Sequence, residues 1–95
     1  MPHMHKLSSY KTAVIERPGL ITVQYHNTVI VEATDDTITL RSGGYETVTT
    51  KRKMNQASSQ FGLGYGVYQK DYRWYVSRRG HEDVPFVDGM KFSRY

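Results

Sequence analysis

Three consecutive cations stand where the sequence predicts the start of a helix. Lys51, Arg52 and Lys53 follow two threonines that can each serve as the helix N-cap, Thr49 and Thr50. Backbone N–H groups at a helix N-terminus carry partial positive charge, so each exposed cation in the first turn is unfavourable by about 0.3–1 kcal/mol. A bound phosphate would reverse this repulsion. The simpler interpretation is that Lys and Arg are good helix formers whose long side chains extend into water.

A second group of residues combines aromatic rings with cations in a predicted β-hairpin. Its members are Tyr65, Tyr68, Lys70, Tyr72, Arg73, Trp74, Tyr75, Arg78 and Arg79. Exposed rings can stack on unpaired bases while interleaved cations meet the phosphate backbone. Strand alternation places Tyr72, Trp74 and Val76 on one face, and we assign Trp74 and Val76 to the core because a thin core needs its single Trp. Arg73 and Tyr75 then lie on the accessible face, unless the aromatic residues are there only as good strand formers.

These two groups define the predicted binding surface for nucleic acid or another phosphate-bearing ligand. The surface consists of Thr49, Thr50, Lys51, Arg52, Lys53, Asn55, Gln56, Arg73 and Tyr75. The two hairpin residues contribute only if the hairpin lies alongside the helix.

Other patterns that could support chemistry are incomplete. The glycines of GLGYG follow a predicted helix and precede a strand, whereas a phosphate-binding glycine loop precedes a helix. The absence of cysteine excludes disulfides, thiolate metal sites and cysteine nucleophiles. The histidines lack a spacing typical of zinc ligands. The candidate catalytic carboxylates, Asp35-Asp36, Glu82-Asp83 and Asp88, lie in predicted turns, where Asp is common for structural reasons. The residues therefore favour a non-enzymatic protein with no catalytic residue, no metal and no cofactor.

The elements before the predicted helix are strands. Apolar residues alternate with polar ones, and Pro-Gly, His-Asn and Asp-Asp pairs separate the alternating runs. This pattern predicts an antiparallel β-meander with strands at residues 10–16, 20–26, 28–33 and 37–41.

The periodicity then changes to that of a helix. Met54, Ala57 and Phe61 recur on one helix face, which predicts a short helix at about 50–61 that ends at Gly62. Phe61 is expected to be the most buried of the three because it is the largest. Strands at 65–70 and 72–77 should form a hairpin about Lys70-Asp71, followed by extended segments at 84–87 and 90–92. The predicted fold class is α+β: a curved antiparallel sheet, one helix and a hairpin.

Length and charge set further bounds. A chain of 95 residues predicts one domain, residues 10–95, after a flexible lead-in at 1–9. Thirteen Lys and Arg against nine Asp and Glu give a net charge of +4, which suits a nucleic-acid partner and argues against an acidic mimic of DNA. No apolar run approaches the roughly 20 residues that cross a bilayer. We therefore expect a cytoplasmic protein without a membrane partner.

Two runs of this sequence carry a resemblance. GGYETVTTKRKMNQ, supported by VYQKDYRWYV, is similar to a group of small uncharacterised bacteriophage proteins. The resemblance implies phage origin and action in the cytoplasm of a bacterial host, and it carries no catalytic role. Small non-enzymatic phage proteins commonly act by binding nucleic acid, a host protein or a defence signal.

Three hypotheses follow from the residues and the resemblance. The first is a binding module for nucleic acid or a phosphate-bearing ligand. The second is an inhibitor that binds a host protein or defence complex through an aromatic anchor on the hairpin. The third is a sponge for a nucleotide signal, which would need a deep pocket.

Overall fold

The computed structural model describes residues 12–44 and 46–94. It confirms the α+β fold, with a β-meander, one helix and a following hairpin. The predicted lead-in at residues 1–9 and the first two residues of the first predicted strand lie outside the described residues. The elements are β1 (Thr12–Arg17), β2 (Leu20–Tyr25), β3 (Thr28–Thr34), β4 (Thr37–Leu40), α1 (Val48–Phe61), β5 (Tyr65–Lys70), β6 (Arg73–Arg78), β7 (Val84–Pro85) and β8 (Met90–Ser93).

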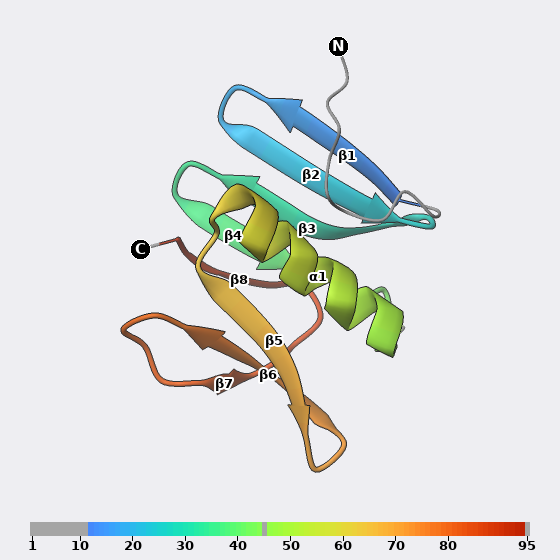
Figure 1. The fold of residues 1–95 in the computed structure, drawn as a ribbon, viewed down its shortest axis with the longest axis vertical. Helices are drawn as coiled ribbons and strands as arrows, with labels where there is room; N and C mark the ends of the chain where they lie inside the picture. Colours follow the sequence, from blue (N-terminus) through green and yellow to red (C-terminus); the bar gives the residue numbers. More distant parts are fainter. Residues whose placement is uncertain (1–11, 45, 95) are drawn as a thin grey trace.

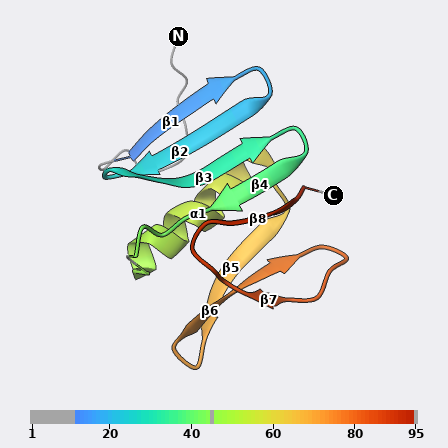
Figure 2. The same ribbon diagram turned by 180° about the vertical axis from the view of Figure 1, so that it is seen from behind.

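The first four strands form a large antiparallel sheet, which β8 completes in the order β1-β2-β3-β4-β8 (Figure 1). One face of this sheet packs into the core, where Val23, Val31 and Leu40 pair across neighbouring strands and are fully buried. Helix α1 lies over this face. The opposite face is polar and carries residues such as Glu32 and Lys91, and in the view from behind it is the face turned to the reader (Figure 2).

A β-bulge interrupts the pairing of β2 with β3. Val23 pairs with Val31 but Gln24 pairs with Val29, so Ile30 has no partner on β2. Ile30 and Val31 are both fully buried although they are neighbours in the sequence. A bulge permits this because the extra residue shifts the alternation by one position. Ile30 also lines a cavity beside the helix, which is described below.

The remaining strands form a small antiparallel sheet in the order β5-β6-β7. Trp74 and Val76 are buried, which confirms their predicted place in the core. The hairpin turn lies one residue later than predicted: Asp71 and Tyr72 are its central residues, both with positive φ. The prediction that Tyr72 shares a strand face with Trp74 was therefore wrong, because the turn takes up the residue that alternation assigned to a strand.

Helix α1 begins at Val48, before the predicted start, and the N-cap is Thr47. It ends at Gly62 in the left-handed conformation, as predicted. Met54 and Ala57 are fully buried, whereas Phe61 is only half-buried. The expectation that Phe61 is the most buried of the three was wrong. Phe61 is the last residue of the helix and lies at the margin of the contact between the helix and the sheet. Position along the helix therefore determines burial more than side-chain size does.

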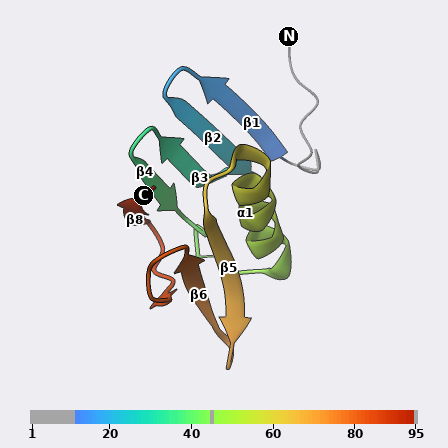
Figure 3. The same cartoon turned by 60° about the vertical axis from the view of Figure 1, so that its left-hand side comes forward.

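The helix also covers the edge of β5, and Figures 1 and 3 both place the two elements side by side. The Ser58 hydroxyl accepts from the Tyr65 N–H at 3.1 Å and donates to its carbonyl at 2.6 Å. The Asn55 amide makes the same pair of bonds with Val67. Side chains of the helix thus satisfy backbone groups that a neighbouring strand would otherwise pair, which protects a sheet edge.

Candidate nucleic-acid interface

The outer face of α1 is basic and amide-rich. None of the 14 residues of the helix is acidic. A shallow depression follows the exposed side, lined by Val48, Lys51, Arg52, Asn55, Gln56, Ser59 and Gln60. We call these residues the outer face of α1. Four residues of the predicted surface, Lys51, Arg52, Asn55 and Gln56, belong to it, and Thr49 in the same helix is partly exposed.

The sequence reasoning missed Ser59 and Gln60, which extend the outer face toward the helix C-terminus. Their signal was present in the helical period. Gln56 and Gln60 are four residues apart, and Arg52 precedes Gln56 by the same interval.

Two amides on the outer face differ in how the fold uses them. The Asn55 side chain bonds both backbone groups of Val67, at 2.8 Å from its nitrogen and 2.7 Å from its oxygen. By contrast, the carbonyl oxygen of Gln56 makes no hydrogen bond within the described part of the chain. Asn55 is therefore a structural residue, whereas this oxygen of Gln56 is not committed to the fold.

Lys53 is placed away from the two cations that precede it. It is only 3% exposed, and its Nζ lies 5.2 Å from the centroid of the Tyr25 ring. Burial lowers the pKa of Lys53. Successive helix residues are about 100° apart, so three in a row cannot all share one face. The accessible predicted surface therefore excludes Lys53.

The start of α1 is already capped by threonine side chains. The Thr47 hydroxyl accepts from the Thr50 N–H at 3.1 Å, and the two hydroxyls are 3.0 Å apart. Thr50 is buried, so it too leaves the accessible surface. Because the helix begins at Val48, Lys51 completes the first turn, and Arg52 and Lys53 lie beyond the turn in which the helix dipole acts most strongly. The predicted repulsion between the cations and the helix start is correspondingly weaker.

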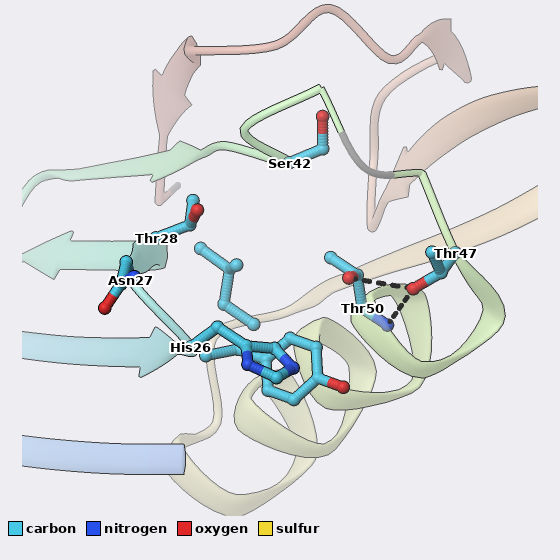
Figure 4. A pocket seen from close by; sticks show the side chains of 8 residues that line it. His26, Asn27, Thr28, Ser42, Thr47 and Thr50 are labelled. Carbon is cyan, nitrogen blue, oxygen red and sulfur yellow. Dashed lines mark hydrogen bonds between the residues drawn. The ribbon is translucent and has the colours of Figure 1, made fainter. Parts of the chain in front are cut away.

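A cavity of about 420 Å³ lies between the β2–β3 turn and the start of α1 (Figure 4). It is lined by Tyr25, His26, Asn27, Thr28, Ile30, Ser42, Thr47 and Thr50. His26 has a φ of +56° at the turn, a conformation that is uncommon outside glycine but that histidine adopts more often than most residues. No Lys or Arg is among these lining residues. The lining residues thus include none of the cations that commonly neutralise a bound phosphate.

The outer face of the β5–β6 hairpin carries aromatic and basic pairs. Tyr68 pairs with Tyr75, and their rings stack with centroids 5.6 Å apart. Lys70 pairs with Arg73 beside the turn, and both are exposed. Arg73 and Tyr75 thus lie on one face of a hairpin whose first strand, β5, packs beside the helix, and their contribution to binding stays a prediction.

Tyr68 is tied to the loop that precedes β7. Its hydroxyl donates to a carboxylate oxygen of Asp83 at 2.5 Å. This hydrogen bond, with the negative charge of Asp83, raises the pKa of Tyr68. The bond holds the stacked pair in one orientation.

Within residues 12–44 and 46–94, no three His, Cys, Asp or Glu side chains are grouped so that they could hold a metal ion. In the same part of the chain, no helix is long and apolar enough to cross a membrane.

Comparison with known proteins places this chain among phage proteins. A family model described as the Kyanoviridae Gp96 protein matches residues 2–93. The chain belongs to this family. The match confirms the predicted resemblance to a small bacteriophage protein family. No curated protein and no solved structure matches the chain. The Gp96 description names no activity, so the roles of individual residues rest on the geometry described above.

Proposed function

We propose that this phage protein binds nucleic acid through the outer face of α1, in the cytoplasm of the host. The observation that carries the proposal is the composition of that face. Lys51 and Arg52 stand beside amide and hydroxyl side chains, on a helix without a single acidic residue. An exposed helix face usually mixes both signs of charge, and the exclusion of acids favours a polyanionic partner.

The side chains of the outer face match the two kinds of contact that nucleic acid offers. Arg and Lys neutralise phosphates and release counterions, which supplies most of the affinity. Glutamine, serine and arginine side chains can hydrogen-bond base edges or sugars. The carbonyl oxygen of Gln56 is buried and makes no hydrogen bond within the described part of the chain, so a rotation of the side chain would bring it to such a contact without breaking a bond of the fold. Ser59 is exposed one turn further along.

Several other cations of the chain serve the fold. Arg41 bonds Glu32 at 3.1 Å. Arg78 lies over the Phe92 ring, 4.8 Å from its centroid, and Arg94 bonds a backbone carbonyl of β3 at 2.6 Å. Lys51 and Arg52 stand apart from these structural roles, on an open face.

The proposal is tested by fluorescence anisotropy with labelled single-stranded and double-stranded DNA and RNA at low salt. We expect binding to at least one of these probes, and we expect Arg52→Ala to weaken it. Lys91→Ala is the matched control, because it removes one exposed cation from the opposite face of the large sheet. Absence of binding to all four probes would overturn the proposal, as would equal losses in the two variants.

A further inference from the structure

The tip of the β5–β6 hairpin presents an aromatic ring to solvent in an unfavourable backbone conformation. Tyr72 is 95% exposed. Its φ is +66°, and that of Asp71 is +53°. Two-residue hairpin turns with positive φ at both central positions strongly prefer Asn-Gly or Asp-Gly. Asp71 fits this preference, whereas a bulky residue such as Tyr72 is an outlier in the left-handed region.

The residues that flank the turn are also unfavourable for the hairpin alone. Lys70 and Arg73 are directly opposite each other in the strand register, and both are exposed. Like charges at directly opposed positions destabilise a strand pair. Asp71 is the one acidic residue of the turn and offsets part of this charge. The tip therefore combines a strained aromatic residue with a like-charged pair, and strain of this kind concentrates at binding sites.

The tip is connected to the outer face of α1 along β5. Ser58 bonds Tyr65 and Asn55 bonds Val67, so the helix runs beside the first half of the strand. Lys51 lies one helical turn before Asn55 and continues this side of the helix toward the tip. From Val67 to Lys70 the strand advances about 10 Å. Figure 1 shows the tip projecting at the lower end of the molecule. The tip therefore lies at the end of the strand that packs beside the helix.

We infer that Tyr72 stacks on an unpaired base while Lys70 and Arg73 contact the adjacent phosphates, so that the preferred ligand is single-stranded nucleic acid. The inference rests on the proposed function and names its substrate class. An unpaired base offers its flat face without cost, whereas insertion of a ring into a duplex requires unstacking of base pairs. Stacking on an aromatic side chain is tolerant of sequence because every base has such a face.

A protein partner fits the tip less well. An aromatic residue that anchors a protein interface is typically enclosed by contacts that exclude water. Tyr72 instead stands between two exposed cations, and charged residues are depleted at the core of protein interfaces. The pairing of a ring with two cations corresponds to a nucleotide, which joins a flat base to negative phosphates.

The experiment compares Tyr72→Gly and Tyr72→Trp with the unmodified protein. Glycine creates the Asp-Gly pair preferred in such turns, so Tyr72→Gly should melt at the same or a higher temperature. It should nevertheless bind a single-stranded DNA oligonucleotide about 5- to 140-fold more weakly. Tyr72→Trp should retain the affinity. Quenching of 2-aminopurine in the bound oligonucleotide reports stacking directly, and the glycine variant should lose it.

The outcomes separate this inference from the proposed function. If single-stranded and duplex DNA of equal length bind equally, and Arg52→Ala weakens both, the helix interface stands and the inference is overturned. Unchanged affinity and quenching in Tyr72→Gly would also overturn it. No binding to any nucleic acid would overturn both. The inference would also be overturned if a host protein is captured through Tyr72 after nuclease treatment and no stacking signal is seen. The ligand of the tip would then be a protein and not a base.

Discussion

Asn55 pairs with Val67 as a neighbouring β-strand would. Its side-chain nitrogen donates to the Val67 carbonyl at 2.8 Å, and its side-chain oxygen accepts from the Val67 N–H at 2.7 Å. One amide thereby joins the helix to the small sheet. The contact sets the position of the hairpin relative to the outer face of α1, on which both proposals depend.

We expect Asn55→Ala to destabilise the protein by about 2–6 kcal/mol, because two backbone groups lose their partner and each unsatisfied buried group costs about 1–3 kcal/mol. Urea unfolding followed by circular dichroism measures this. Gln56→Ala is the matched control, since the carbonyl oxygen of Gln56 makes no hydrogen bond in the described part of the chain. It should change stability little. Equal effects of the two substitutions would show that the Asn55 bonds are not what holds β5.

Met54→Ala should destabilise the protein by about 2–5 kcal/mol, the usual range for truncation of a buried Met. Phe61→Ala should cost less, because Phe61 is half-buried at the end of the helix whereas Met54 is fully buried. Thermal melts of the two variants decide the order. A larger loss for Phe61→Ala would mean that the helix end, and not its middle, carries the contact with the large sheet.

Lys53 should make stability depend on pH in the alkaline range. Burial lowers its pKa in the folded protein from the ordinary lysine value of 10.5. Between the lowered pKa and 10.5 the unfolded chain binds more protons than the folded protein, so this residue makes stability rise with pH there. Lys53→Met should remove that rise. Urea titrations between neutral and alkaline pH give the free energy of unfolding of each protein. The difference between the unmodified protein and the variant at each pH isolates the contribution of Lys53.

The same variant tests which cations face a ligand. Lys53→Met should leave nucleic-acid affinity unchanged, because Lys53 is directed toward the Tyr25 ring. Lys51→Met should weaken affinity, because Lys51 lines the outer face of α1. Anisotropy titrations of the two variants give the comparison. If Lys53→Met proves the more damaging, the ligand lies on the side of the cavity and not on the outer face.

Much of the fold follows from local signals. Alternation and turn pairs predict the strands to within one or two residues, since inward and outward positions differ every second residue and Pro-Gly or Asp-Asp interrupts the pattern. The end of α1 at Gly62 is predictable because a left-handed helix cap favours glycine. The pairing of β8 with β4 is not predictable in this way. It joins residues about fifty positions apart, and no local pattern specifies the partner of an edge strand.

The candidate surface is harder to predict from the sequence than the fold. Lys53 and Thr50 are buried because of the side of α1 that meets the large sheet, which the sequence does not specify. A helix flanked by two sheets also has a wider buried face than a helix on one sheet. The bulge at Ile30 and the turn at Tyr72 each shift alternation by one residue, which a strict period of two does not anticipate. The involvement of Lys51, Arg52, Gln56, Arg73 and Tyr75 in binding stays a prediction.

The slope of log affinity against log salt concentration tests the central proposal most directly. A nucleic acid held through phosphates on α1 gives a steep negative slope, because each neutralised phosphate releases counterions. Replacement of both Lys51 and Arg52 by alanine should reduce the magnitude of that slope by about 1–2, and Lys91→Ala should leave it unchanged. A slope near zero, or one that is insensitive to the Lys51 and Arg52 pair, would contradict the proposal that the outer face of α1 binds nucleic acid.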